Sequence, residues 1–169
     1  LAKRGKLLHI HQTVAHAPKM LRAQAAYAAS LREDSSLPRD LQELLILRIA
    51  QINGCLFCQD WRTDRDGEML EDGFADAVAA WRTTDAFDDR TRLAAEYADR
   101  YALDHHGLDQ AFWDRMRAHY DQREVVELSM CLGSWLAFGR LNHVLGLDRI
   151  CTLPSHAARA EPPPADGPG

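Results

Sequence analysis

Residues 43–58 read Glu43-Leu-Leu-Ile-Leu-Arg-Ile-Ala-Gln-Ile-Asn-Gly-Cys55-Leu-Phe-Cys58. Two cysteines, separated by two residues, follow a dense apolar run that contains one carboxylate. Such a run indicates a helix that is buried on most sides, and Asn53-Gly54 is a turn signal that ends it. We therefore expect the cysteine pair to begin a second helix, directly after the end of a buried one.

Helical periodicity continues along almost the whole chain, and strand signals are nearly absent. Asp88 and Asp121 are suited to cap helices, and Glu124 gives the latter the pattern of a capping box. The expected helices occupy residues 18–32, 38–53, 55–71, a short Ala-rich segment ending near 81, a segment after Asp88, 109–119, and a long apolar segment after Asp121. The sequence predicts an all-α, multi-helix bundle over residues 17–153, with an N-terminal extension at 1–16 and a Pro/Ala/Gly-rich disordered tail at 154–169.

The composition is that of an ordinary soluble domain: 169 residues, 46% hydrophobic and 27% charged, with a net charge of −5. An acidic chain with scattered Lys and Arg argues against a nucleic-acid partner. No apolar run approaches the ~20 residues that cross a bilayer, so no membrane partner is expected. Lys3, Arg4 and Lys6 are not followed by the apolar segment of a signal peptide. We therefore expect a cytoplasmic location.

The chain has four cysteines: Cys55, Cys58, Cys131 and Cys151. In the first turn of a helix, residues i and i+3 can form a disulfide, and the backbone N–H groups there favour a thiolate. Structural zinc is the competing use of this spacing, but it normally needs two further Cys or His ligands. Plain buried thiols are the third interpretation. The pattern favours a redox-active pair, and we expect neither a metal nor a cofactor.

Two charged residues accompany the pair. Glu43 is either a surface carboxylate on an exposed stripe or a partly buried base that accepts a proton from a thiol. Arg62 lies four residues after Cys58, on the same helical face; its permanent charge can lower a thiol pKa but cannot release a proton. The simpler interpretation of Arg62 is a salt bridge to Asp60, Asp66 or Glu43.

Glu43, Cys55-Leu-Phe-Cys58 and the flanking apolar context resemble the alkylhydroperoxidase D-like branch of the carboxymuconolactone decarboxylase superfamily. The segments 37–41, 72–73 and 123–128 match as well, so the resemblance covers about residues 17–147. It implies an all-helical domain that assembles into a trimer or hexamer, with thiol-dependent peroxidase activity. Its partners would be a hydroperoxide substrate and a thiol or dithiol reductant.

The resemblance also implies roles for particular residues. Cys58 would attack the peroxide, Cys55 would resolve the sulfenic acid to a disulfide, and Glu43 would begin a proton relay through a histidine. That histidine is replaced here by Arg62, which would act electrostatically. His143 is the favoured substitute from elsewhere in the chain; the other candidates are His105, His106 and His119.

Two functions follow as expectations. The first is a hydroperoxide reductase that cycles the Cys55/Cys58 dithiol, with Glu43 as proton acceptor. The alternative is a non-enzymatic redox-sensing or assembly module, in which the dithiol is a switch and Arg62 has removed efficient turnover. Decarboxylase relatives generally lack the cysteine pair, so decarboxylation is disfavoured. His9, His11 and His16 are interpreted as part of a solvated extension.

Overall fold

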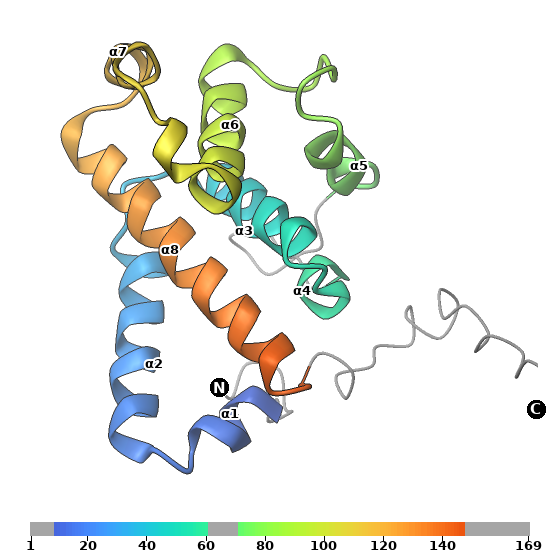
Figure 1. Ribbon diagram of the computed structural model, residues 1–169, viewed down its shortest axis with the longest axis vertical. Coiled ribbons are helices and arrows are strands. Elements are labelled where there is room, and N and C mark those ends of the chain that lie inside the picture. The colour runs from blue at the N-terminus through green and yellow to red at the C-terminus, as the bar shows by residue number, and fades with distance from the viewer. Residues whose placement is uncertain (1–8, 61–70, 148–169) are drawn as a thin grey trace, which may run out of the picture.

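The computed structural model describes residues 9–60 and 71–147, and within these ranges it contains helices and no strand (Figure 1). The predicted tail, Cys151 and Arg62 lie outside the described residues. None of the described helices is long and apolar enough to cross a membrane. The α-helices are α1 (His9–Val14), α2 (Pro18–Glu33), α3 (Arg39–Ile52), α4 (Leu56–Asp60), α5 (Phe74–Ala79), α6 (Asp89–Leu103), α7 (Gln110–His119) and α8 (Gln122–Val144), and a 3₁₀ helix, η2, spans His105–Gly107.

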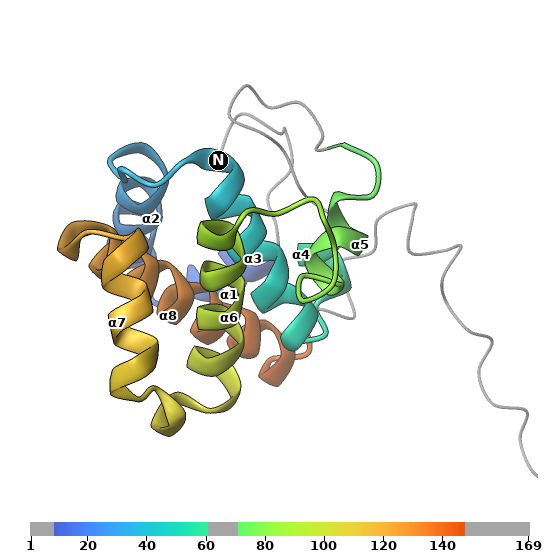
Figure 2. The ribbon, with the colours of Figure 1, turned by 90° about the horizontal axis from the view of Figure 1, so that it is seen from above.

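Helix α3 is the centre of the fold. It packs mainly against α6 and α8, and α4 and α5 lie near its C-terminal end (Figures 1 and 2). Every residue from 41 to 47 is buried, because neighbouring helices cover α3 on several sides. This confirms the burial expected from the apolar run. The all-α architecture is confirmed for the described part of the chain.

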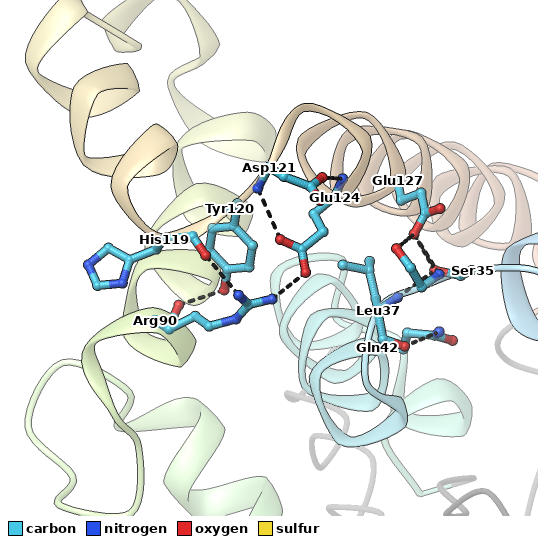
Figure 3. Close-up of polar contacts among 10 residues, drawn as sticks. Ser35, Leu37, Gln42, Arg90, His119, Tyr120, Asp121, Glu124 and Glu127 are labelled. Atoms are coloured by element: carbon cyan, nitrogen blue, oxygen red, sulfur yellow. Dashed lines mark hydrogen bonds and ion pairs between the residues drawn. The ribbon is translucent and has the colours of Figure 1, made fainter.

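Aspartate caps begin three of the helices, and two of them were expected from the sequence. Asp88 accepts a hydrogen bond from the Thr91 amide at 2.7 Å. Asp121 accepts from the Glu124 amide at 2.8 Å, while Glu124 accepts from the Asp121 amide at 3.0 Å (Figure 3). Asp109 caps α7 in the same way. Each cap satisfies backbone donors that the first helical turn leaves unpaired.

The N-terminal segment differs from the expected solvated arm. Residues 9–14 form α1, which lies beside the C-terminal end of α8 in both views (Figures 1 and 2). His11 is half-buried, and burial lowers the pKa of its imidazole. A helix of six residues is too short to show a clear hydrophobic period, so the sequence pattern did not reveal α1.

Arg90 ties α6 to the junction between α7 and α8 (Figure 3). Its guanidinium donates to the His119 carbonyl at 2.7 Å and to Glu124 Oε1 at 2.6 Å. The buried Tyr120 hydroxyl donates to the Arg90 carbonyl at 2.7 Å, and burial raises the pKa of that phenol.

A second polar cluster joins α3 to α6. Asp99 of α6 is only 6% exposed, and its carboxylate accepts three hydrogen bonds. Arg48 Nε of α3 donates to Oδ1 at 2.5 Å, whereas Trp81 Nε1 and Arg82 Nη2 donate to Oδ2 at 3.2 and 2.6 Å. Gln51 extends the connection, because its amide nitrogen donates to the Ala75 carbonyl of α5 at 3.0 Å. These contacts hold the C-terminal half of α3 in place.

Glu127 joins α8 to the loop between α2 and α3 (Figure 3). Its Oε2 accepts from the hydroxyls of Ser35 and Ser36 at 2.9 and 2.8 Å and from the Ser36 amide at 2.8 Å, and Arg123 Nε donates to Oε1 at 2.7 Å. Burial disfavours the charged carboxylate, but hydrogen bonds from Arg123, Ser36 and Ser35 outweigh it and lower the pKa of Glu127 to about 2.

We expect Glu127→Gln to destabilise the protein by about 2 kcal/mol near neutral pH, allowing for the exposure of Arg123. The pKa of Glu127 is lower in the folded protein than in the unfolded chain, where it is 4.5. The stability that Glu127 contributes is therefore present above pH 4.5 and is lost as the pH falls towards about 2. Urea unfolding as a function of pH measures this, with the exposed Glu71→Gln as control. A stability difference that stays constant across that window would contradict the assignment.

Candidate redox-active site

The chain turns sharply between α3 and α4, and the turn presents the cysteine pair. The backbone N–H of Asn53 donates to the Ile49 carbonyl, and the backbone N–H of Cys55 donates to the Ala50 carbonyl, both at 2.9 Å. Gly54 has a φ of +66°, a left-handed conformation that glycine adopts without steric strain. The turn predicted at Asn53-Gly54 is therefore present, and α4 begins at Leu56 beside the end of α3 (Figure 1).

The two cysteines differ in exposure. Cys55 is 4% exposed, whereas Cys58 is only half-buried. The Cys58 amide donates to Cys55 Sγ at 3.3 Å, so the sulfur of Cys55 receives an N–H group from the first turn of α4. Such a contact stabilises negative charge on sulfur. The more accessible sulfur is thus that of Cys58, and the sulfur beside a backbone donor is that of Cys55.

Glu43 is buried, at 2% exposed, which decides against the surface interpretation. It forms an ion pair with Arg39, one turn earlier on α3. The guanidinium of Arg32 of α2 is also within electrostatic reach of Glu43. The neighbouring Gln42 is buried as well and donates to the Leu37 carbonyl at 3.0 Å. The start of α3 therefore holds a buried, charge-compensated carboxylate.

Glu43 and the cysteines lie at opposite ends of α3. The nine residues from Glu43 to Ile52 rise by about 13 Å in an α-helix. This rise places the backbone of Glu43 about 13 Å from the end of α3, where the cysteine turn begins. Arg62, which stands where the resemblance implies a histidine, lies outside the described residues.

The remaining candidates are spread over the fold. His143 is exposed in the last turn of α8. His105 and His106 are exposed in η2, with ring centroids 4.0 Å apart. His119 ends α7, which both views place on the opposite side of the bundle from α4 (Figures 1 and 2). Of the four, His143 is on the helix whose C-terminal end reaches the cysteine turn.

Cys131 is a different kind of thiol. It is fully buried in α8, and burial, with a smaller effect of the Glu127 charge, raises its pKa to about 12. A thiol that stays protonated and inaccessible is a poor nucleophile. Across residues 9–60 and 71–147, no group of three or more His, Cys, Asp or Glu side chains is arranged to hold a metal ion.

Comparison with known proteins identifies the family. Residues 18–100 match the Carboxymuconolactone decarboxylase family. The uncharacterized protein YnjA of Escherichia coli (strain K12) is 32% identical over 128 residues, which cover 73% of this chain and 69% of YnjA. The chain belongs to the carboxymuconolactone decarboxylase family. This confirms the resemblance seen in Glu43 and the cysteine motif.

Two solved structures share the fold of this chain. ATU0492 from Agrobacterium tumefaciens, a protein of unknown function described as a candidate antioxidant defence protein AhpD, superposes with a TM-score of 0.69 at 22% identity, covering 84% of this chain and 95% of its own. The debrominase Bmp8 superposes with a TM-score of 0.72 at 16% identity, covering 86% and 82%. At these identities the likeness shows the AhpD-like fold alone.

Sequence reasoning missed several residues near the site. Arg39, the ion-pair partner of Glu43, was noted only as part of segment 37–41, which resembles the family. Asn53 was noted only as a turn signal. Gly139 of α8 was not noticed, although it packs directly on Asn53. No local pattern reveals such a contact, because it joins residues 86 positions apart.

Proposed function

We propose that this protein is a thiol-dependent hydroperoxide reductase that cycles Cys55 and Cys58 between dithiol and disulfide. The observation that carries the proposal is the asymmetric pair in the first turn of α4, with an accessible Cys58 and a buried Cys55 whose sulfur accepts the Cys58 amide. Membership of a family with AhpD-like structural neighbours supports an enzymatic, peroxidase-related role.

In the first step, the Cys58 thiolate attacks the terminal oxygen of a hydroperoxide. The O–O bond breaks, Cys58 becomes a sulfenic acid, and the departing alkoxide takes up a proton to leave as an alcohol. In the second step, Cys55 attacks the sulfur of the sulfenic acid. The disulfide forms and hydroxide leaves as water with the proton of Cys55. An external thiol or dithiol then reduces the disulfide.

Protons must move during both steps, and Glu43 is proposed as the acceptor at the far end of a relay. Its burial and its ion pair with Arg39 fix its position at the start of α3. Arg62 is proposed as an electrostatic activator of the thiols, and His143 as the histidine that reaches the site from α8.

We also propose that the chain works as a homo-oligomer, a trimer or hexamer, in the cytoplasm. Helix α2 buries Leu31 alone; Leu21, Gln24 and Tyr27 are half-buried, and its other residues are exposed. Apolar side chains on α2 and α8 are solvent-exposed in the isolated chain, among them Met20 at 70% and Val126 at 56%. An assembly that covers this apolar surface accounts for their positions.

The order of the two cysteines is tested by Cys55→Ser. We expect this variant to react with tert-butyl hydroperoxide and to accumulate a sulfenic acid at Cys58, because the resolving sulfur is absent. Mass spectrometry after dimedone trapping locates the adduct. Cys131→Ala is the control and should form the Cys55–Cys58 disulfide as the wild type does. An adduct at Cys131, or at no cysteine, would overturn the proposed roles.

A further inference from the structure

Helix α8 touches the cysteine turn through a glycine. A Cβ atom added at Gly139 would lie 2.3 Å from Asn53 Nδ2 and 3.3 Å from Asn53 Cγ. Non-bonded heavy atoms are best separated by about 3.5–4.0 Å, so the Asn53 side chain occupies the space that a larger residue at position 139 would need. Glycine at this position is what permits the turn and the backbone of α8 to approach so closely.

The Asn53 side chain has little room to move away from α8. Its amide nitrogen is buried and has no hydrogen-bond partner among the residues that the structure describes. A side chain whose end is enclosed by closely packed protein has no open space to turn into when a neighbour grows. A methyl group at position 139 would therefore displace the turn itself relative to α8.

The turn passes such a displacement on to the cysteines. Three consecutive backbone N–H groups, those of residues 53–55, donate to carbonyls in the last turn of α3 at 2.9–3.1 Å. Asn53 and Cys55 are joined by Gly54, so the segment moves as one compact unit. Helix α4, which carries Cys58, has five residues and is too short to be stable without packing against its surroundings. The placement of both sulfurs therefore depends on the turn.

We propose that Gly139 is a positioning residue for the redox pair. By admitting the Asn53 side chain against α8, it fixes the turn that presents Cys55 and Cys58 so that their sulfurs close readily into a disulfide. Two thiols that are held near each other have a high effective concentration, which favours the bond between them. The proposal rests on the dithiol–disulfide cycle of the proposed function and adds a residue that tunes it.

The disulfide equilibrium tests this without any peroxide. Each variant is equilibrated with mixtures of oxidised and reduced dithiothreitol. The S–S bond of the reagent breaks, the Cys55–Cys58 bond forms, and the two thiol protons pass to the reagent. Mass spectrometry after acid quenching and alkylation gives the oxidised fraction. In Gly139→Ala we expect the equilibrium constant for disulfide formation to fall by about tenfold or more, which corresponds to about 30 mV in reduction potential.

Gly133→Ala is the matched control. Gly133 lies in the same helix, so alanine brings the same gain in helix propensity there. The atom nearest to an added Cβ is the Tyr101 hydroxyl, at 2.8 Å. Tyr101 lines an open pocket between α2, α6 and α8, into which its side chain can move. This variant should therefore keep the wild-type disulfide equilibrium.

The double variant Gly139→Ala/Asn53→Ala separates positioning from a loss of stability. With alanine at both positions the two Cβ atoms would be 3.7 Å apart, an ordinary van der Waals contact, so we expect the wild-type equilibrium to return. Asn53→Ala alone leaves a gap in place of the contact. It should shift the equilibrium in the same direction as Gly139→Ala but less, and it carries the test if Gly139→Ala does not fold.

An equilibrium constant for Gly139→Ala equal to that of Gly133→Ala would overturn the proposal, even with a lower free energy of unfolding, since Gly139 would then serve only the packing of α8. A double variant that stays shifted would overturn it as well. Peroxide consumption by the wild type is measured separately. Consumption together with an unshifted Gly139→Ala equilibrium removes the positioning role and leaves the function. A shifted equilibrium without consumption supports the positioning role and removes the proposed function.

Discussion

Replacing Cys58 by serine is expected to reduce hydroperoxide turnover by on the order of a thousandfold or more. A serine hydroxyl stays protonated at neutral pH and forms neither a sulfenic acid nor a disulfide, so both chemical steps lose their central atom. The half-buried position of Cys58, against the nearly complete burial of Cys55 and Cys131, is why we propose this sulfur as the attacking one. The measurement is consumption of tert-butyl hydroperoxide with excess dithiothreitol as reductant.

Cys131→Ala is the matched control, since it also removes one thiol from the described part of the chain. It should retain most of the wild-type turnover, because the buried Cys131 thiol has a raised pKa and no access to substrate. Turnover by Cys58→Ser that equals the wild-type value would refute the assignment of the nucleophile. A large loss of turnover in Cys131→Ala, together with unchanged turnover in Cys58→Ser, would instead assign the nucleophile to Cys131 of α8.

The largest effect on stability is expected at Asp99. Replacing it by alanine should destabilise the protein by about 3 kcal/mol, because Arg48 would be left partly buried without its counter-charge and Trp81 Nε1 without its acceptor. Arg82 adds little to this loss, since it is largely exposed and can return to water. Urea unfolding followed by circular dichroism gives the change in the free energy of unfolding.

Asp114→Ala is the control for the loss of a carboxylate. Asp114 pairs with Arg117 on the exposed face of α7, where water screens the interaction, and its removal should produce no measurable change. If Asp99→Ala unfolds at the same urea concentration as Asp114→Ala, the cluster does not hold α3 against α6. The two variants therefore separate a buried contact between helices from a surface ion pair.

Local patterns predicted the helices and their ends well. The apolar run of α3, the caps at Asp88 and Asp121, and the turn at Asn53-Gly54 each depend on neighbouring residues, which the sequence displays directly. The resemblance to the family likewise came from a local motif, the cysteine pair with its flanking residues. The short α1 helix was missed because its few residues show no period.

The site was predictable only in part, because its geometry depends on contacts between distant segments. The sequence left open whether Glu43 was buried; α3 is covered on several sides, which decides it. Likewise, the ion pair between Arg48 and Asp99 and the approach of Gly139 to Asn53 arise from helix packing. Residue types alone could not show that Gly139 of α8 would meet Asn53 beside the cysteine turn.

The most direct test is to count reduced thiols before and after one equivalent of an organic hydroperoxide, with wild type and Cys58→Ser side by side. If the protein is a dithiol peroxidase, the wild type should lose two of its four cysteine thiols much faster than free cysteine reacts, and Cys58→Ser should lose none at that rate. Thiol loss no faster than that of free cysteine would contradict the peroxidase assignment and favour a redox-sensing or assembly role for the pair.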